Sequence, residues 1–114
     1  MTVTIYHNPR CGKSRETLAL LRTRGIEPRI VDYQQTPLDA KTLRRLLAML
    51  GGDVRQMLRT GEAEFKREKL AGVGDATTVI AAIVRHPILL QRPIVVANGK
   101  AAIGRPPEAI LSIL

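Results

Sequence analysis

The chain has 114 residues, of which 45% are hydrophobic, and its formal net charge is +8 from 18 Lys and Arg against 10 Asp and Glu. This length predicts a single domain over residues 1–114. No signal peptide precedes the first predicted strand, and the longest apolar run, 79–84, is far shorter than the roughly 20 residues of a membrane-spanning helix. We therefore expect a cytoplasmic protein with no membrane partner.

The basic balance is compatible with nucleic acid, a membrane surface or small anions as partners. The cations are scattered along the chain, and we expect most of them to form a solvated surface. Side chains that could stack on bases are limited to Tyr6, Tyr33 and Phe65. We therefore predict no nucleic-acid partner, while a small anion remains possible.

The first third of the chain has the pattern of a βαβ unit. Alternation over Thr2–His7 predicts a strand, and Asn8–Arg10 is predicted to be a turn. A helix is expected from about Cys11 to Arg24, ended by Gly25, and a second strand over Pro28–Tyr33. Such a unit of about thirty residues predicts parallel strands with a right-handed crossover.

The middle of the chain is predicted to be helical. Thr36 has the character of an N-cap, with Pro37 in the first turn of an amphipathic helix that ends at Gly51-Gly52. Asp53 is predicted to cap a short helix, and another short helix is expected over Phe65–Leu70. A longer helix is expected to begin at Asp75 or Thr77, with four residues facing inward: Val79, Ile80, Ile83 and Val84.

The last part predicts a hairpin and a final helix. Asn98-Gly99 is a strong hairpin signal between strands at Ile94–Ala97 and Lys100–Gly104. Pro106-Pro107 is predicted to open a helix whose inner side carries Ile110, Leu111 and Leu114. The resulting order, βαβ, helices, then ββα, predicts an α/β thioredoxin-like fold with a helical insertion between its two halves.

Cys11 is the only cysteine in the chain, so no internal disulfide can form. A lone cysteine is commonly inert core filler. Cys11, however, follows a predicted strand and begins a predicted helix, where free N–H groups and the helix dipole stabilise a thiolate. Nearby positive charge from His7, Arg10, Lys13 and Arg15 would lower its pKa further. We predict a reactive thiolate that depends on an external thiol for redox turnover.

Three neighbours have candidate supporting roles. Ser14 stands where dithiol oxidoreductases have a second cysteine, and its hydroxyl can donate to the thiolate. His7 is expected to contact the thiolate or an anion as imidazolium, although it can instead satisfy backbone groups of the turn. In a thioredoxin-like fold, Pro93 is expected to follow a cis peptide bond and to face Cys11.

Several sequence blocks resemble the glutaredoxin-dependent arsenate reductase family, in the family's order and at similar separations. These blocks are His7–Arg15, Val54–Arg59, His86–Leu89, Arg92–Val96 and Gly104–Pro106. The resemblance implies a catalytic Cys11 and three oxyanion-binding arginines, Arg59, Arg92 and Arg105. Guanidinium groups suit this role because they are always charged and can bind an oxyanion with two parallel hydrogen bonds.

The resemblance also implies a reaction. Cys11 attacks arsenate, glutathione adds as cosubstrate, glutaredoxin resolves the mixed disulfide, and arsenite leaves, with no bound cofactor or metal. Two alternatives remain open. One is a glutathione-linked thiol-disulfide reductase with another substrate, because Cys11 and Ser14 specify thiol chemistry alone. The other is a regulatory or interaction module, since the wider family includes regulators that bind RNA polymerase; these typically carry C-x-x-C, which Ser14 argues against.

Overall fold

The computed structural model describes residues 2–114 and divides into two compact units. The first unit contains the chain up to Thr36 together with Arg92–Leu114, and the second contains Pro37–Gln91. Within residues 2–114, no helix is both long and apolar enough to cross a membrane. The single domain over residues 1–114 remains a prediction.

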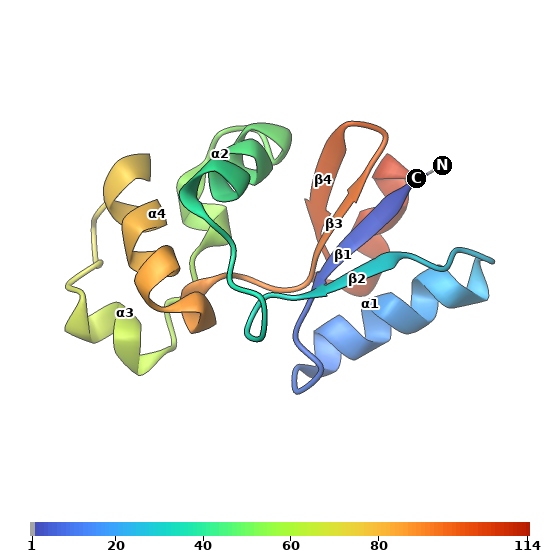
Figure 1. Ribbon diagram of the computed structural model, residues 1–114, viewed down its shortest axis with the longest axis horizontal. Helices are drawn as coiled ribbons and strands as arrows, with labels where there is room; N and C mark the ends of the chain where they lie inside the picture. Colours follow the sequence, from blue (N-terminus) through green and yellow to red (C-terminus); the bar gives the residue numbers. More distant parts are fainter. Residues whose placement is uncertain (1) are drawn as a thin grey trace. The chain divides into compact units, whose positions relative to one another are not determined.

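The first unit is built on a four-stranded sheet in the order β2-β1-β3-β4 (Figure 1). The strands are β1 (Val3–His7), β2 (Arg29–Asp32), β3 (Ile94–Ala97) and β4 (Lys100–Ile103). β1 is parallel to β2 and antiparallel to β3, which pairs antiparallel with β4. In the hairpin turn, Asn98 and Gly99 have φ of 55° and 73°, as this dipeptide predicts. The predicted thioredoxin-like α/β fold is confirmed.

One face of this sheet is covered by α1 (Gly12–Thr23) and η3 (Pro107–Ile113), which pack against each other. Gly25, at φ 75°, follows the end of α1 as predicted. The final helix differs from the prediction because it is a 3-10 helix, in which residues three apart share a face. Its buried side chains are therefore Pro107, Ile110 and Ile113, while Leu111 and Leu114 are only partly buried.

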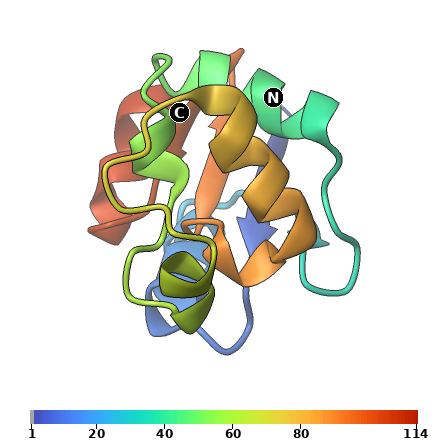
Figure 2. The same ribbon diagram turned by 90° about the vertical axis from the view of Figure 1, so that its left-hand side faces the viewer.

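The second unit is helical and contains no strand. Its elements are α2 (Ala40–Met49), η1 (Val54–Met57), α3 (Ala63–Arg67), α4 (Ala76–Arg85) and η2 (Pro87–Leu89). α2 contacts α4, and an isolated antiparallel bridge joins Leu58 to Leu90. The segment between α3 and α4, yellow in Figure 2, has neither helix nor strand.

The start of α2 differs from the prediction. Asp39, rather than Thr36, is its N-cap, and the Asp39 carboxylate accepts a hydrogen bond of 2.8 Å from the Thr42 backbone N–H. The backbone N–H of Thr36 instead donates to the Asp32 carbonyl at 2.8 Å and closes the turn after β2. Thr36 is thus held outside the helix by the strand that precedes it.

Two further predictions in this unit need correction. The short helix lies at Ala63–Arg67 instead of 65–70, because Lys69 adopts a left-handed φ of 54° that a helix cannot continue through. In α4, capped by Asp75 as one of the two predictions had it, Val84 is 40% exposed and Ala82 is buried. Ala82 lies three residues after Val79 and so shares its face of the helix.

Candidate active site

The turn between β1 and α1 is fixed by hydrogen bonds around Asn8. The Asn8 carbonyl accepts from the Cys11 N–H at 3.0 Å, and the Asn8 side-chain oxygen accepts from the Arg10 N–H at 3.0 Å. Arg15, from the first turn of α1, donates through Nη1 to the Pro9 carbonyl at 3.0 Å. These bonds hold Cys11 at the N-cap position of α1, where the helix presents its free N–H groups.

The partly buried thiol of Cys11 is surrounded by donors and positive charge. Burial alone raises the pKa of Cys11, but several groups outweigh it. The backbone N–H of Ser14 and the side chain of Arg92 donate to the sulfur, and the charge of Arg105 and the N–H of Lys13 add to their effect. The net result is a pKa of Cys11 below its ordinary value, which increases the thiolate fraction at neutral pH.

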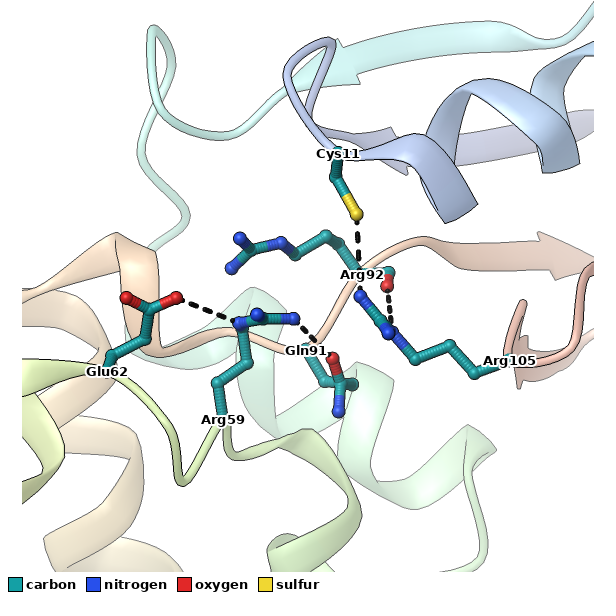
Figure 3. Close-up of polar contacts among 6 residues, drawn as sticks. All are labelled: Cys11, Arg59, Glu62, Gln91, Arg92 and Arg105. Carbon is teal, nitrogen blue, oxygen red and sulfur yellow. Dashed lines mark hydrogen bonds and ion pairs between the residues drawn. The ribbon is translucent and has the colours of Figure 1, made fainter.

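Arg92, which precedes β3, and Arg105, which follows β4, converge on Cys11. Arg105 Nη2 lies 3.4 Å from Cys11 Sγ, while Arg105 Nε donates to the Arg92 carbonyl at 2.8 Å (Figure 3). Arg92 is only 7% exposed, whereas Arg105 is exposed. The peptide bond between Arg92 and Pro93 is cis, as predicted, and so is the bond between Arg105 and Pro106, which was not predicted. Arg92 and Arg105, both distant from Cys11 in sequence, therefore meet at its thiol.

Gly104 makes this convergence sterically possible. A Cβ at this position would lie 2.4 Å from Thr17 Oγ1 and 2.7 Å from Pro93 Cγ. Thr17 is fully buried in α1, and its hydroxyl donates to the Lys13 carbonyl at 2.8 Å. The Gly104 N–H donates to the Pro93 carbonyl at 2.9 Å. Sequence reasoning assigned no role to Gly104 or Thr17; the only signal was a glycine directly before Arg105.

His7 and Ser14 form a buried pair beneath the turn. His7 Nδ1 lies 2.6 Å from Ser14 Oγ, and the same oxygen accepts from the Asn8 N–H at 3.0 Å. Burial lowers the pKa of His7; Asp32 opposes this effect, while Arg22 and Arg15 reinforce it. The net effect is a pKa of His7 below its ordinary value, which favours the neutral imidazole over the imidazolium. The Ser14 hydroxyl contacts His7 and Asn8, and Ser14 reaches the thiol through its backbone N–H.

Arg59 belongs to the second unit, where two side chains hold its guanidinium. Arg59 Nε donates to Glu62 Oε1 and Nη1 donates to Gln91 Oε1, both at 3.1 Å (Figure 3). The Arg59 N–H also donates to the Leu89 carbonyl at 2.8 Å, beside the bridge between Leu58 and Leu90. Sequence reasoning missed both partners; the available signals were an acid three residues after Arg59 and an amide directly before Arg92.

Known proteins resemble this chain over nearly its whole length. The ArsC family model matches residues 6–113. The uncharacterized protein YfgD of Escherichia coli (strain K12) is 54% identical over 98% of this chain and 96% of its own. An arsenate reductase of Haemophilus influenzae is 47% identical over 100% of both chains. A solved arsenate reductase from Vibrio cholerae has a TM-score of 0.95 at 47% identity, covering 100% of this chain and 98% of its own. With this extent of agreement, the chain belongs to the ArsC family.

Proposed function

We propose that this protein reduces arsenate to arsenite, with Cys11 as the nucleophile. The observation that carries the proposal is the placement of Cys11 Sγ 3.4 Å from the Arg105 guanidinium and within reach of the Arg92 side chain. A thiolate beside two fixed guanidinium groups can attack an oxyanion that those groups bind. The relatives named arsenate reductases in Haemophilus influenzae and Vibrio cholerae support arsenate as that oxyanion.

In the first step, the Cys11 thiolate attacks the arsenic atom of arsenate. A sulfur–arsenic bond forms, and one arsenate oxygen accepts protons and leaves as water, so arsenic remains As(V). Arg92 and Arg105 donate to the remaining oxygens and stabilise their negative charge during the attack. Arg105 is oriented for this by the bond from its Nε to the Arg92 carbonyl.

Reduction requires two electrons, which come from two sulfur atoms. Cys11 is the only cysteine of the chain, so the second sulfur belongs to an external thiol, for which we propose glutathione. Its thiolate attacks the Cys11 sulfur, the sulfur–arsenic bond breaks, and its electron pair converts As(V) to arsenite. Glutaredoxin then takes the glutathione from the mixed disulfide and regenerates the Cys11 thiol. Because this cycle needs reduced thiols, we propose a cytoplasmic location.

We further propose Arg59 as a third oxyanion ligand. The resemblance to the arsenate reductase family implies this role for Arg59, and the ArsC family model matches residues 6–113, a range that includes Arg59. A tetrahedral oxyanion has enough oxygens to accept from three guanidinium groups.

The proposal is tested by measuring arsenite formation with glutathione and glutaredoxin present. Cys11→Ser is expected to abolish turnover. Arg92→Lys and Arg105→Lys are expected to lower kcat/KM by about tenfold or more, since lysine keeps the charge but loses the paired donors. Arg44→Lys is the matched control, because Arg44 lies in α2 and bonds the Thr77 hydroxyl. Absence of turnover by the intact protein, or full turnover by Cys11→Ser, contradicts the proposal.

A second candidate is a glutathione-linked reductase of small disulfides. It is favoured by the backbone N–H groups of Ser14 and Lys13 at Cys11, since these stabilise a thiolate without any oxyanion. A disulfide assay with bis(2-hydroxyethyl) disulfide separates the two functions. Two results together exclude this candidate: loss of arsenate turnover in Arg105→Ala, and negligible disulfide reduction by the intact protein.

A further inference from the structure

We infer that Glu62 is an internal counter-ion of Arg59 that competes with an incoming oxyanion and so weakens its binding. The inference rests on the proposed function in one respect, namely that Arg59 is an oxyanion ligand. It adds a specificity-determining residue for which the family resemblance gives no role. Its basis is the arrangement of Glu62 and Gln91 on the Arg59 guanidinium.

A guanidinium group offers two edges to an anion, one formed by Nε and Nη2 and the other by Nη1 and Nη2. Glu62 Oε1 accepts from Arg59 Nε at 3.1 Å, and Gln91 Oε1 accepts from Arg59 Nη1 at 3.1 Å. Each edge therefore has one of its two nitrogens already bonded. Because Nε carries a single hydrogen, an oxyanion can gain a bidentate contact with the Nε and Nη2 edge of Arg59 only by displacing Glu62.

The two partners differ in how they affect an anion. Gln91 is neutral, and its amide nitrogen can itself donate to an oxyanion oxygen. Glu62 carries a negative charge that repels a second anion on the same guanidinium. Glu62 also occupies the N-cap position of α3 without making a side-chain cap bond, and its carboxylate points to Arg59 instead. Glu62 is thus the partner that opposes binding.

Burial makes this opposition significant. The side chains of Arg59 and Glu62 are 23% and 25% exposed, so their charges are less screened than those of a surface pair. The backbones of Arg59 and Gln91 are fixed independently of Glu62, since the Arg59 N–H bonds the Leu89 carbonyl and the Gln91 N–H bonds the Met57 carbonyl at 2.7 Å. Neutralising Glu62 is therefore expected to change the charge at Arg59 with little change in the position of its backbone.

The test is Glu62→Gln, which keeps the size of the side chain and an oxygen that can accept from Arg59. The anion affinity is measured as protection of Cys11 from alkylation by iodoacetamide over a range of sulfate or arsenate concentrations. We expect the protection constant to tighten about fivefold, the order of effect for a partly shielded charge pair. Glu64→Gln is the matched control, since Glu64 lies in α3, is 24% exposed and pairs with Arg67.

A second pair of variants ties the effect to Arg59. In an Arg59→Ala background, Glu62→Gln is expected to leave protection unchanged, because the guanidinium for which carboxylate and anion compete is gone. Unchanged or weaker protection in Glu62→Gln overturns the inference, as does equal tightening in Glu64→Gln. The readout needs no turnover. Tightening without arsenite formation contradicts only the proposed reduction of arsenate, whereas turnover with protection that depends on Arg59 and is insensitive to Glu62 contradicts only this inference.

Discussion

Gly104→Ala is the substitution that most directly tests how the site is assembled. The added methyl group would lie 2.4 Å from Thr17 Oγ1, 3.1 Å from Thr17 Cγ2 and 2.7 Å from Pro93 Cγ. Neither neighbour can yield easily, because Thr17 is fully buried and bonded to the Lys13 carbonyl, and Pro93 has a rigid ring. Overpacking of this kind costs about 1–3 kcal/mol of the free energy of unfolding.

The same substitution is expected to disturb the chemistry. Arg105 follows Gly104 directly, so a shift of the backbone away from Thr17 moves the guanidinium off Cys11 Sγ, which it now approaches to 3.4 Å. We expect the pKa of Cys11 to rise toward its ordinary value and kcat/KM for arsenate to fall by about tenfold or more. Urea unfolding measures the loss of unfolding free energy, and the pH dependence of iodoacetamide alkylation measures the change in the pKa of Cys11.

A second substitution tests whether the steric conflict with Thr17 causes the loss of stability in Gly104→Ala. Combining Gly104→Ala with Thr17→Ala removes both Thr17 contacts, so the double variant is expected to lose less stability than the sum of the two single variants. Gly74→Ala is the control, because a Cβ there meets nothing within 4 Å. The reasoning is refuted if Gly104→Ala has the same urea unfolding midpoint and the same pKa of Cys11 as the unsubstituted protein.

Three further predictions concern titration and helix capping. Arg105→Ala should raise the pKa of Cys11 toward the ordinary thiol value, seen as a shift of the alkylation profile to higher pH; an unchanged profile would show that the Arg105 charge does not act on the thiol. Because burial lowers the pKa of His7, the unfolded state binds more protons just below pH 6.5, so the free energy of unfolding should fall as pH is lowered through that range. His7→Gln should flatten this part of a pH series of urea unfolding curves, and an equal slope in both proteins contradicts the assignment. Asp39→Ala should lower the free energy of unfolding more than Thr36→Ala does, measured by the same unfolding method, whereas the reverse order would restore Thr36 as the cap.

The elements that could be predicted are those decided by neighbours in the sequence. Asn98-Gly99 specifies a tight hairpin because both residues accept positive φ, and Gly25 ends α1 for the same reason. The start of α2 could not be decided this way, since Thr36 and Asp39 are both good N-caps. A backbone hydrogen bond from Thr36 to Asp32, at the end of β2, determines the outcome.

In the candidate site, too, only the residue placed by a local pattern could be predicted from the sequence alone. The position of Cys11 follows from a strand followed by a helix, a local pattern. Arg105 is 94 residues away, and only a family resemblance grouped it with Cys11 before the structure did so. Gly104 and Glu62 had no local signal of comparable strength, because the role of each depends on contacts formed after folding: Gly104 with Thr17, and Glu62 with Arg59.

These contacts also give the two units different electrostatic roles. In the first unit, Arg105 bonds a backbone carbonyl and a thiol, so its charge remains available to stabilise the thiolate and an oxyanion. In the second unit, Arg59 already has a carboxylate partner. The Cys11 region can therefore activate its thiol before any anion arrives. Arg59, if it binds the oxyanion as we propose, contributes its full charge only to an anion that displaces Glu62.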